Sequence, residues 1–221
     1  MKLLIFNKRK SVDNRKIHLI TYSNADSVIS DQFRTIRTNI KFLMDEKKNS
    51  VFLITSPGVG EGKSTTAANL AVSIAQQKDS VLLIDANLRE PVIQDIFQIS
   101  NETGLTNVLE GSAILDQAIS RTDIKNLDVL TSGTSVLNPT EILGSDVMMN
   151  LLNEASTRYN VVLIDSPTIL SSTETRVLAN QCEGVVLVLE HGKTELENAI
   201  ESKRILELAH ANLLGVIIND K

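Results

Sequence analysis

The stretch "VFLITSPGVGEGKSTTAANLA", Val51 to Ala71, decides the fold of this chain. It predicts a buried strand over Val51–Thr55, then a glycine-rich turn, then a helix that begins at Lys63. In such a turn, small residues let successive backbone N–H groups point toward one anion, and the helix N-terminus adds its dipole. The stretch therefore predicts a phosphate-binding loop.

The loop departs by one residue from the strict P-loop pattern G-x-x-x-x-G-K-[ST], because Pro57 stands at the position of the first glycine. Lys63 can still reach the outer phosphates of a nucleotide, and the Ser64 hydroxyl can ligate Mg²⁺. An ordinary glycine-rich turn between a strand and a helix is the alternative interpretation, and the Gly-Lys-Ser triplet argues against it. The residues predicted to bind the nucleotide are Gly58, Val59, Gly60, Glu61, Gly62, Lys63, Ser64 and Thr65.

Short apolar runs alternate with helical stretches along the rest of the chain. The predicted strands are Val51–Thr55, Val81–Asp85, Leu127–Thr131, Val161–Asp165, Val185–Glu190 and Leu213–Ile218, and the predicted helices are Ser30–Asp45, Lys63–Gln77, Glu141–Thr157 and Thr194–His210. Near-continuous apolar strands suit a parallel sheet covered on both faces. The alternation implies a doubly wound, mainly parallel α/β sheet in one P-loop domain, 30–221, after an extended basic segment, 1–29.

Two of the predicted strands end in an aspartate. Asp165 ends "VVLID", where a Walker-B aspartate belongs, and Asp85 ends "VLLID", the strand that follows the phosphate-loop helix. Either carboxylate can hold Mg²⁺ or orient a water beside the phosphates. An aspartate at a strand end often only caps the following turn. Two of them on one sheet edge with a phosphate loop indicate a nucleoside-triphosphate site.

Composition limits the class of protein. The formal net charge of −5 over 221 residues argues against nucleic-acid binding, for which a basic surface is expected. The single cysteine, Cys182, excludes a disulfide framework and fits a reducing cytosol. No run approaches the roughly 18 apolar residues of a membrane span. The first sixteen residues carry six Lys or Arg against Asp13, which indicates either a solvated terminus or a weak attraction to anionic lipid.

Six segments carry a family resemblance: "DQFRTIRTNIKF", "GEGKSTTAANLA", "VLLIDANLREP", "LDVLTSGTSVLNPTEIL", "YNVVLIDSPTIL" and "LLGVIIN". With them, the sequence from about Ser30 onward resembles the cytosolic bacterial tyrosine kinases of the CpsD/CapB family, which are relatives of the partition and septum-placement ATPases. The block with "TSG" and "NPTEIL" is typical of this family and not of P-loop proteins at large, so it argues against a partition-type ATPase.

The resemblance implies roles for individual residues. Asp85 matches the first aspartate of a Walker A′ motif, Asp165 the Walker-B aspartate, and Asn219 an asparagine that contacts the purine of ATP. The implied catalytic set is Lys63, Asp85, Asn87 and Asp165, and the implied Mg²⁺ ligands are Ser64, Asp85 and Asp165. An E-x-x-R-x-x-R oligomerisation motif is matched, with Asp in place of Glu, by Asp31, Arg34 and Arg37, which their spacing places on one helix face.

The sequence departs from the family at the second Walker A′ position, which is Asn87 instead of aspartate. An amide can hydrogen-bond a tyrosine hydroxyl but cannot take its proton, and loss of a positioned base typically costs about 10²–10⁴-fold in rate. After Asp165 the family's T-P-P is replaced by S-P-T. The sequence ends at Lys221 without a tyrosine-rich tail, and its two tyrosines are Tyr22 and Tyr159. We therefore expect no tail autophosphorylation in this chain.

The resemblance implies an ATP-dependent protein-tyrosine kinase that regulates capsule or exopolysaccharide synthesis. Its implied partners are protein tyrosines, further copies of the chain in a ring, and a membrane-spanning activator of the polysaccharide co-polymerase type. That activator would hold a cytoplasmic protein at the inner face of the cell membrane. Asn87 and the missing tail favour an alternative, a nucleotide-gated assembly protein that binds ATP and a membrane partner without effective kinase activity.

Overall fold

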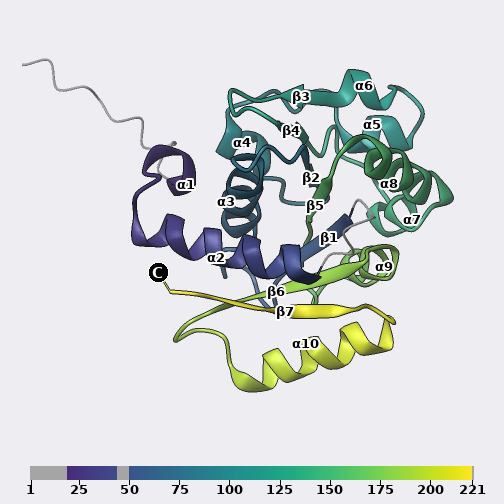
Figure 1. The fold of residues 1–221 in the computed structure, drawn as a ribbon. Coiled ribbons are helices and arrows are strands. Elements are labelled where there is room, and N and C mark those ends of the chain that lie inside the picture. The colour runs from purple at the N-terminus through teal and green to yellow at the C-terminus, as the bar shows by residue number, and fades with distance from the viewer. Residues whose placement is uncertain (1–18, 44–49, 221) are drawn as a thin grey trace, which may run out of the picture.

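The computed structural model describes residues 19–43 and 50–220. They form a seven-stranded sheet in the order β3-β4-β2-β5-β1-β6-β7 with helices on both faces (Figure 1). All neighbouring strands are parallel except β3 and β4. The strands are β1 Ser50–Thr55, β2 Val81–Asp85, β3 Ile119–Arg121, β4 Leu127–Leu130, β5 Val161–Asp165, β6 Gly184–Glu190 and β7 Leu213–Asn219. The predicted doubly wound α/β fold is confirmed.

Ten helices connect or flank the strands in the described residues. Their bounds are α1 Ile20–Ser23, α2 Val28–Leu43, α3 Lys63–Ala75, α4 Ile93–Phe97, α5 Leu105–Leu109, α6 Leu115–Ala118, α7 Pro139–Leu143, α8 Asp146–Arg158, α9 Thr173–Gln181 and α10 Leu196–Leu208. The sequence did not predict α4, α5, α6 and α9, nor the strand β3. Most of these have three to five residues, which is too short for a clear periodicity signal.

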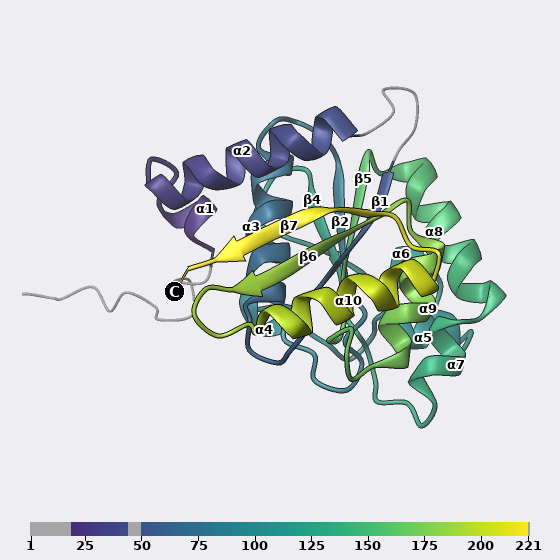
Figure 2. The same cartoon turned by 90° about the horizontal axis from the view of Figure 1, so that it is seen from below.

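The sheet separates two apolar clusters. Successive residues of a strand point to opposite faces, so Phe52 and Ile54 of β1 pack in the cluster of helices α2, α3 and α4, whereas Val51 and Leu53 pack in the cluster of helices α5 to α10. Figure 2 shows β6 and β7 between α2 on one side and α10 on the other. Burial on both faces explains why β1, β2 and β5 are fully buried apolar runs.

The single helix predicted over Glu141–Thr157 is wrong, because the chain forms α7 and α8 there. The break lies at Gly144 and Ser145. Ser145 has an extended backbone, and its hydroxyl accepts the N–H of Met148 at 3.3 Å, which caps the N-terminus of α8. Serine is among the residues most favoured at that position. A capping serine inside a helical pattern therefore divided it into two helices.

The N-terminal region differs from the extended start that the sequence predicted. Ile20–Ser23 form α1, which is attached to α3 by Thr21: its N–H and its hydroxyl both donate to Asn69 Oδ1, at 3.1 and 3.0 Å. The extended prediction is therefore wrong for α1. The six basic residues of the first sixteen lie outside the described residues, and the domain boundary at residue 30 stays a prediction. Across 19–43 and 50–220, no helix has the length and apolar character that crossing a membrane requires.

Candidate functional site

The phosphate loop connects β1 to α3 at the carboxyl edge of the sheet. Gly60 and Gly62 have φ angles of +78° and +89°, a left-handed backbone that residues with a Cβ adopt only with strain. Since α3 begins at Lys63, its first N–H groups and its positive dipole end lie at this loop. The local sequence thus forms a cradle for an anion.

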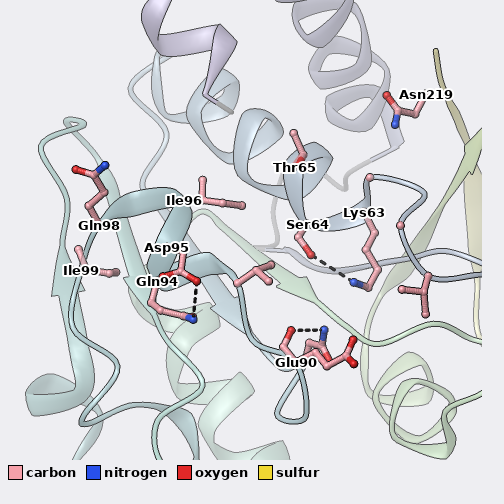
Figure 3. Close-up of a pocket in the computed structure, with 15 residues that line it drawn as sticks. Lys63, Ser64, Thr65, Glu90, Gln94, Asp95, Ile96, Gln98, Ile99 and Asn219 are labelled. Carbon is pink, nitrogen blue, oxygen red and sulfur yellow. Dashed lines mark hydrogen bonds between the residues drawn. The ribbon is translucent and has the colours of Figure 1, made fainter. Parts of the chain in front are cut away.

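Lys63 and Ser64 lie side by side at the start of α3. The Lys63 ammonium donates to Ser64 Oγ at 3.3 Å, and both residues line a large cavity together with Thr65. Figure 3 shows the two side chains meeting near the middle of this cavity. A positive charge, a hydroxyl and a helix N-terminus therefore converge on one point, which is the arrangement that the sequence predicted.

Asp165 ends β5, the strand beside β1, and lies opposite Ile54. Its side chain is fully buried, and neither carboxylate oxygen accepts a hydrogen bond from the described residues. Burial raises the pKa of Asp165, and the nearby Lys63 charge, followed by the Ser64 hydroxyl, partly offsets this rise. Because buried polar atoms nearly always have partners, an orphaned carboxylate beside a phosphate loop fits a bound cation.

Asp85 ends β2 and lies directly opposite Asp165 in the sheet register. In contrast to Asp165, its oxygens have partners: Oδ1 accepts the Asn87 N–H at 3.1 Å, and Oδ2 accepts the N–H groups of Val92 and Ile93 at 3.1 and 3.0 Å. Burial and then the Asp165 charge raise its pKa, and the three backbone donors oppose the rise. In this structure Asp85 fixes the loop that leads from β2 into α4.

The oxygen ligands at this site suit Mg²⁺ that is bound together with nucleotide phosphates and water, and not a metal ion that protein ligands alone enclose. The described residues contain no group of three or more His, Cys, Asp or Glu that could enclose a metal ion. Mg²⁺ usually takes one or two protein ligands and fills its other positions with water and substrate phosphates. Asp165 and Ser64 offer such a partial shell. The prediction that Asp85 is a metal ligand remains untested, and in this structure its oxygens accept three backbone N–H groups.

Asn87, at the second Walker A′ position, is also buried, with 7% of its surface exposed. Its Nδ2 donates to the carbonyl oxygen of Glu90 at 2.7 Å, the bond drawn beside Glu90 in Figure 3. A carboxylate at this position could not donate that bond. The amide is therefore part of the loop structure and leaves its Oδ1 to accept a hydrogen bond.

Asn219 lies at the end of β7, on the far side of the phosphate loop from α4 (Figure 3). Its Nδ2 donates to the Glu61 carbonyl oxygen at 3.1 Å, and the residue lines the same cavity as Lys63. Glu61 itself is buried, and its Oε1 accepts the Thr194 hydroxyl at 2.8 Å. The predicted purine contact is thus attached directly to the phosphate loop.

A second attachment of the loop comes from the turn between β6 and α10. The Lys193 ammonium donates to the Val59 carbonyl oxygen at 3.0 Å and to Glu190 Oε2 at 3.1 Å. A Cβ on Gly60 would lie 3.0 Å from the same ammonium. The sequence analysis missed Lys193 and Thr194. Their only signal is a polar turn, "HGKTE", directly after the carboxyl end of a buried strand.

The cavity has a volume of about 1040 Å³. Besides the phosphate loop and Asn219, its walls include the loop after β2 and α4, which the sequence did not single out (Figure 3). The residues missed there are Glu90, Val92, Gln94, Asp95, Ile96, Gln98 and Ile99. The phosphate loop and Asn87 lie with these residues around one space large enough for a nucleotide.

The predicted oligomerisation residues divide into two groups on α2. Asp31 and Arg34 are exposed and form an ion pair with each other, and Arg34 also donates to the Ala25 carbonyl at 2.7 Å. Arg37 instead donates to the Ser73 carbonyl on α3, and burial is the first cause that lowers its pKa. The spacing in the sequence placed Asp31, Arg34 and Arg37 on one helix face. In the structure, Arg37 attaches α2 to α3 within the same chain.

Comparison with known proteins yields consistent similarities. The profile of an AAA-domain family matches residues 49–206, which include the phosphate loop and both buried aspartates. Tyrosine-protein kinase YwqD of Bacillus subtilis is 45% identical over 204 residues, which are 92% of this chain and 86% of that protein. The chimerical protein CapA2B2 superimposes with a TM-score of 0.88 at 35% identity, over 92% of this chain and 89% of that one.

A more distant similarity concerns the septum site-determining protein MinD of Pyrococcus horikoshii, solved in complex with Mg-ADP. It has a TM-score of 0.66 at 25% identity, over 77% of this chain and 70% of that one. The expected relation to septum-placement ATPases is therefore confirmed.

Proposed function

This chain belongs to the AAA-domain family and, within it, to the bacterial tyrosine-protein kinases, and from that premise we propose that it transfers the γ-phosphoryl group of ATP to protein tyrosines. We further propose that the transfer uses Mg²⁺ and regulates capsule or exopolysaccharide synthesis. The observation that carries this proposal is the fully buried Asp165 carboxylate, unpartnered beside Lys63 and Ser64. A nucleotide-bound cation is the partner that its chemistry suits.

The proposed roles follow from position. Lys63 and the N–H groups at the start of α3 neutralise the charge of the outer phosphates. When bound, Mg²⁺ would be held by Ser64 and Asp165 and would supply further charge neutralisation. Asn219 contacts the purine from the end of β7. Asp85 holds the loop that carries Asn87 against the phosphates.

In the proposed reaction, the tyrosine oxygen forms a bond to the γ-phosphorus while the bond from that phosphorus to the bridging oxygen breaks. ADP leaves with the electron pair. Asn87 Oδ1 can accept a hydrogen bond from the tyrosine hydroxyl and orient it, but it cannot remove the proton. That proton passes to an oxygen of the transferred phosphoryl group. Phosphoryl transfer depends chiefly on positioning and charge stabilisation, so the reaction proceeds, at a reduced rate, without a residue acting as base.

The proposal includes two kinds of partner. The chimera CapA2B2 supports an association with a second protein, which we propose is a membrane-spanning activator that holds this chain at the inner face of the membrane. We also propose association with further copies through the exposed pair Asp31 and Arg34.

A second candidate function is a nucleotide-gated assembly protein without effective kinase activity. It is favoured by one observation, the Asn87 amide that is bound to Glu90 where a catalytic base is expected. This candidate function uses the same nucleotide site as the kinase. The two functions differ in that the assembly protein forms no phosphotyrosine.

The nucleotide site is tested by titrating MgATP into the wild-type protein and Lys63→Met in a calorimeter. We expect the variant to lose measurable binding, because it lacks the charge that meets the outer phosphates. Lys203→Met is the matched control, since Lys203 lies exposed on α10 and its ion-pair partner within the described residues is the exposed Glu207. Equal affinity of wild type and Lys63→Met would refute the site. Incubation of the wild type with a tyrosine-containing peptide then separates the two candidate functions.

A further inference from the structure

The sheet ends on one side in a long apolar edge strand, β7. In the strand order β7 lies last, and across 19–43 and 50–220 no strand pairs with its outer edge. The edge strand at the other end, β3, has three residues, whereas β7 has seven, with no charged side chain and no proline. Proteins usually protect edge strands by keeping them short or charged, because the open edge binds further strands. The edge of β7 lacks that protection and can pair with a further strand.

The surface beside this edge is apolar as well. Val216 and Ile218 of β7 are 49% and 68% exposed, and Leu196 and Ile200 of α10 are 70% and 60% exposed. Figure 2 shows α10 running alongside β7. Single exposed apolar residues are ordinary on a protein surface, but several of them along an open strand are typical of a binding site. A strand that pairs with β7 would cover these side chains with apolar residues of its own.

Residues 1–18, which lie outside the described residues, contain a run suited to such pairing. The sequence "LLIF", Leu3–Phe6, is apolar throughout, and its isoleucine and phenylalanine favour strands. In a strand, alternate residues face opposite sides, so two of the four side chains could face the exposed apolar surface of β7 and α10.

The point where this segment joins the described chain lies close to β7. Leu19 belongs to the apolar cluster against which Leu214 and Ile217 of β7 also pack. Figures 1 and 2 both show α1 near the C-terminal end of β7. Twelve residues separate Phe6 from Leu19. An extended chain of that length reaches about 40 Å, against about 23 Å for seven residues of a strand. The apolar run can therefore reach the whole edge of β7.

Charge favours the same arrangement. Residues 1–18 carry six Lys or Arg against one Asp, a net charge of +5, so residues 19–221 carry −10 to give the total of −5. Glu195 and Glu197 are exposed at the start of α10, at the same edge of the sheet as the end of β7. If Leu3–Phe6 runs parallel to β7, the basic run Lys8–Lys10 arrives at these acidic residues. Opposite charges at this short range attract even at physiological salt.

We propose that residues 1–18 bind the outer edge of β7, with Leu3–Phe6 as a further parallel strand and Lys8–Lys10 against Glu195 and Glu197. Main-chain hydrogen bonds and the cover of exposed apolar side chains stabilise this contact, which does not depend on kinase activity. β7 ends at Asn219, whose Nδ2 donates to the phosphate loop, so the added strand also holds one wall of the nucleotide cavity.

Hydrogen exchange of the full chain, followed by mass spectrometry, tests this contact. We expect Leu4→Asp, which places a charge in the apolar run, to speed amide exchange in Leu213–Asn219 at least about fivefold. Exchange in Val161–Asp165, the buried strand β5, should not change. Leu137→Asp is the matched control, since Leu137 is 98% exposed on the loop before α7, and it should leave β7 as in the wild type. Unchanged exchange of β7 in Leu4→Asp would overturn the proposal.

Cross-linking then identifies what occupies the edge. A carbodiimide joins a lysine amine to a neighbouring carboxylate, so we expect links from Lys8 or Lys10 to Glu195 or Glu197, located by mass spectrometry of the digested protein. In a mixture of isotope-labelled and unlabelled protein, each link should join peptides of one kind. Links between labelled and unlabelled peptides would assign the edge to a second copy and overturn the proposal, as would the absence of these links. Weaker binding of Leu4→Asp to phosphatidylserine vesicles, with unchanged exchange of β7, would assign the segment to lipid instead.

Discussion

Lys193 and Val59 are 134 residues apart in the chain, yet the Lys193 ammonium donates to the Val59 carbonyl oxygen at 3.0 Å. The neighbouring Thr194 hydroxyl donates to the buried Glu61. Through these two bonds the turn after β6 holds the exposed part of the phosphate loop. The loop therefore depends on a distant segment for its shape, in addition to its own glycines.

Lys193→Ala should weaken MgATP binding about two- to tenfold, the equivalent of one typical hydrogen bond that orders the loop. Calorimetry gives the affinity, and Lys203→Ala is the matched control on the exposed side of α10. Lys193→Arg should restore part of the affinity, because it keeps a donor near Val59. If Lys193→Ala binds as tightly as the control, the contact does not order the loop.

Asn87→Asp should raise the rate of tyrosine phosphorylation by at least about tenfold, because it supplies a base that can take the acceptor proton. The same change should lower the stability of the nucleotide-free protein by about 1 kcal/mol or more, since it removes the bond to Glu90 and adds a charge near Asp85. Phosphotyrosine on a peptide and thermal unfolding are the two measurements. A variant that is as stable as wild type and no faster would contradict both expectations.

The buried aspartates should make the stability of the nucleotide-free protein depend on pH. Because burial raises the pKa of Asp85 and Asp165, the folded protein binds these protons more tightly than the unfolded chain does. The contribution of these two carboxyl groups to the free energy of unfolding is then fully present below the unfolded-state pKa of about 3.9. It is lost as the pH rises through their pKa values in the folded protein. Asp165→Asn should remove much of this loss, so the nucleotide-free variant gains stability over wild type as the pH rises.

Urea unfolding at a series of pH values measures this difference. Glu207→Gln, an exposed carboxylate on α10, is the control and should shift the curve little. Addition of MgATP should reverse the order, because the cation binds the ionised wild-type carboxylate and has no such ligand in Asp165→Asn. A difference between variant and wild type that does not change with pH would argue against buried, unpaired charge.

If the chain phosphorylates itself, phosphate should appear on Tyr22 and not on Tyr159. The Tyr159 hydroxyl donates to Asp128 Oδ2 at 2.9 Å, and burial followed by that bond raises its pKa well above the usual range. Tyr22, in contrast, is 49% exposed on α1. Mass spectrometry after incubation with MgATP locates the phosphate, and Tyr22→Phe should abolish it whereas Tyr159→Phe should not.

The two arginines of α2 should respond differently to substitution. Arg34→Ala should lower the mass measured by light scattering with MgATP present. It should leave the melting temperature nearly unchanged, because the described partners of the Arg34 side chain are Asp31 and the Ala25 carbonyl, both close to it in the chain. Arg37→Ala should instead destabilise the fold by about 1.5 kcal/mol, as expected on loss of a bond from a charged donor to Ser73. Equal mass for Arg34→Ala and wild type would mean that the exposed pair is only a solvated face.

The parts of the site that the sequence predicted are those encoded locally. A Gly-Lys-Ser triplet after an apolar run specifies the phosphate loop, and two apolar runs that end in Asp85 and Asp165 specify the carboxylates. The parts that it missed depend on contacts between distant segments, such as Lys193 with Val59 and Thr194 with Glu61. Neither pair has a spacing or a periodicity that can be recognised. The short helix α4 was missed because five residues carry little pattern.

The position of β1 in the sheet has a consequence for how the protein folds. β1 pairs with β5 and β6, whose residues follow it by more than a hundred positions, and not with any strand close to it in the chain. Pairings of this kind require closure of long loops, which makes folding slow. During synthesis, the phosphate loop can therefore gain the support of β5, β6 and Lys193 only after those residues have left the ribosome, so we expect ATP to stabilise the assembled sheet more than it guides the early steps of folding.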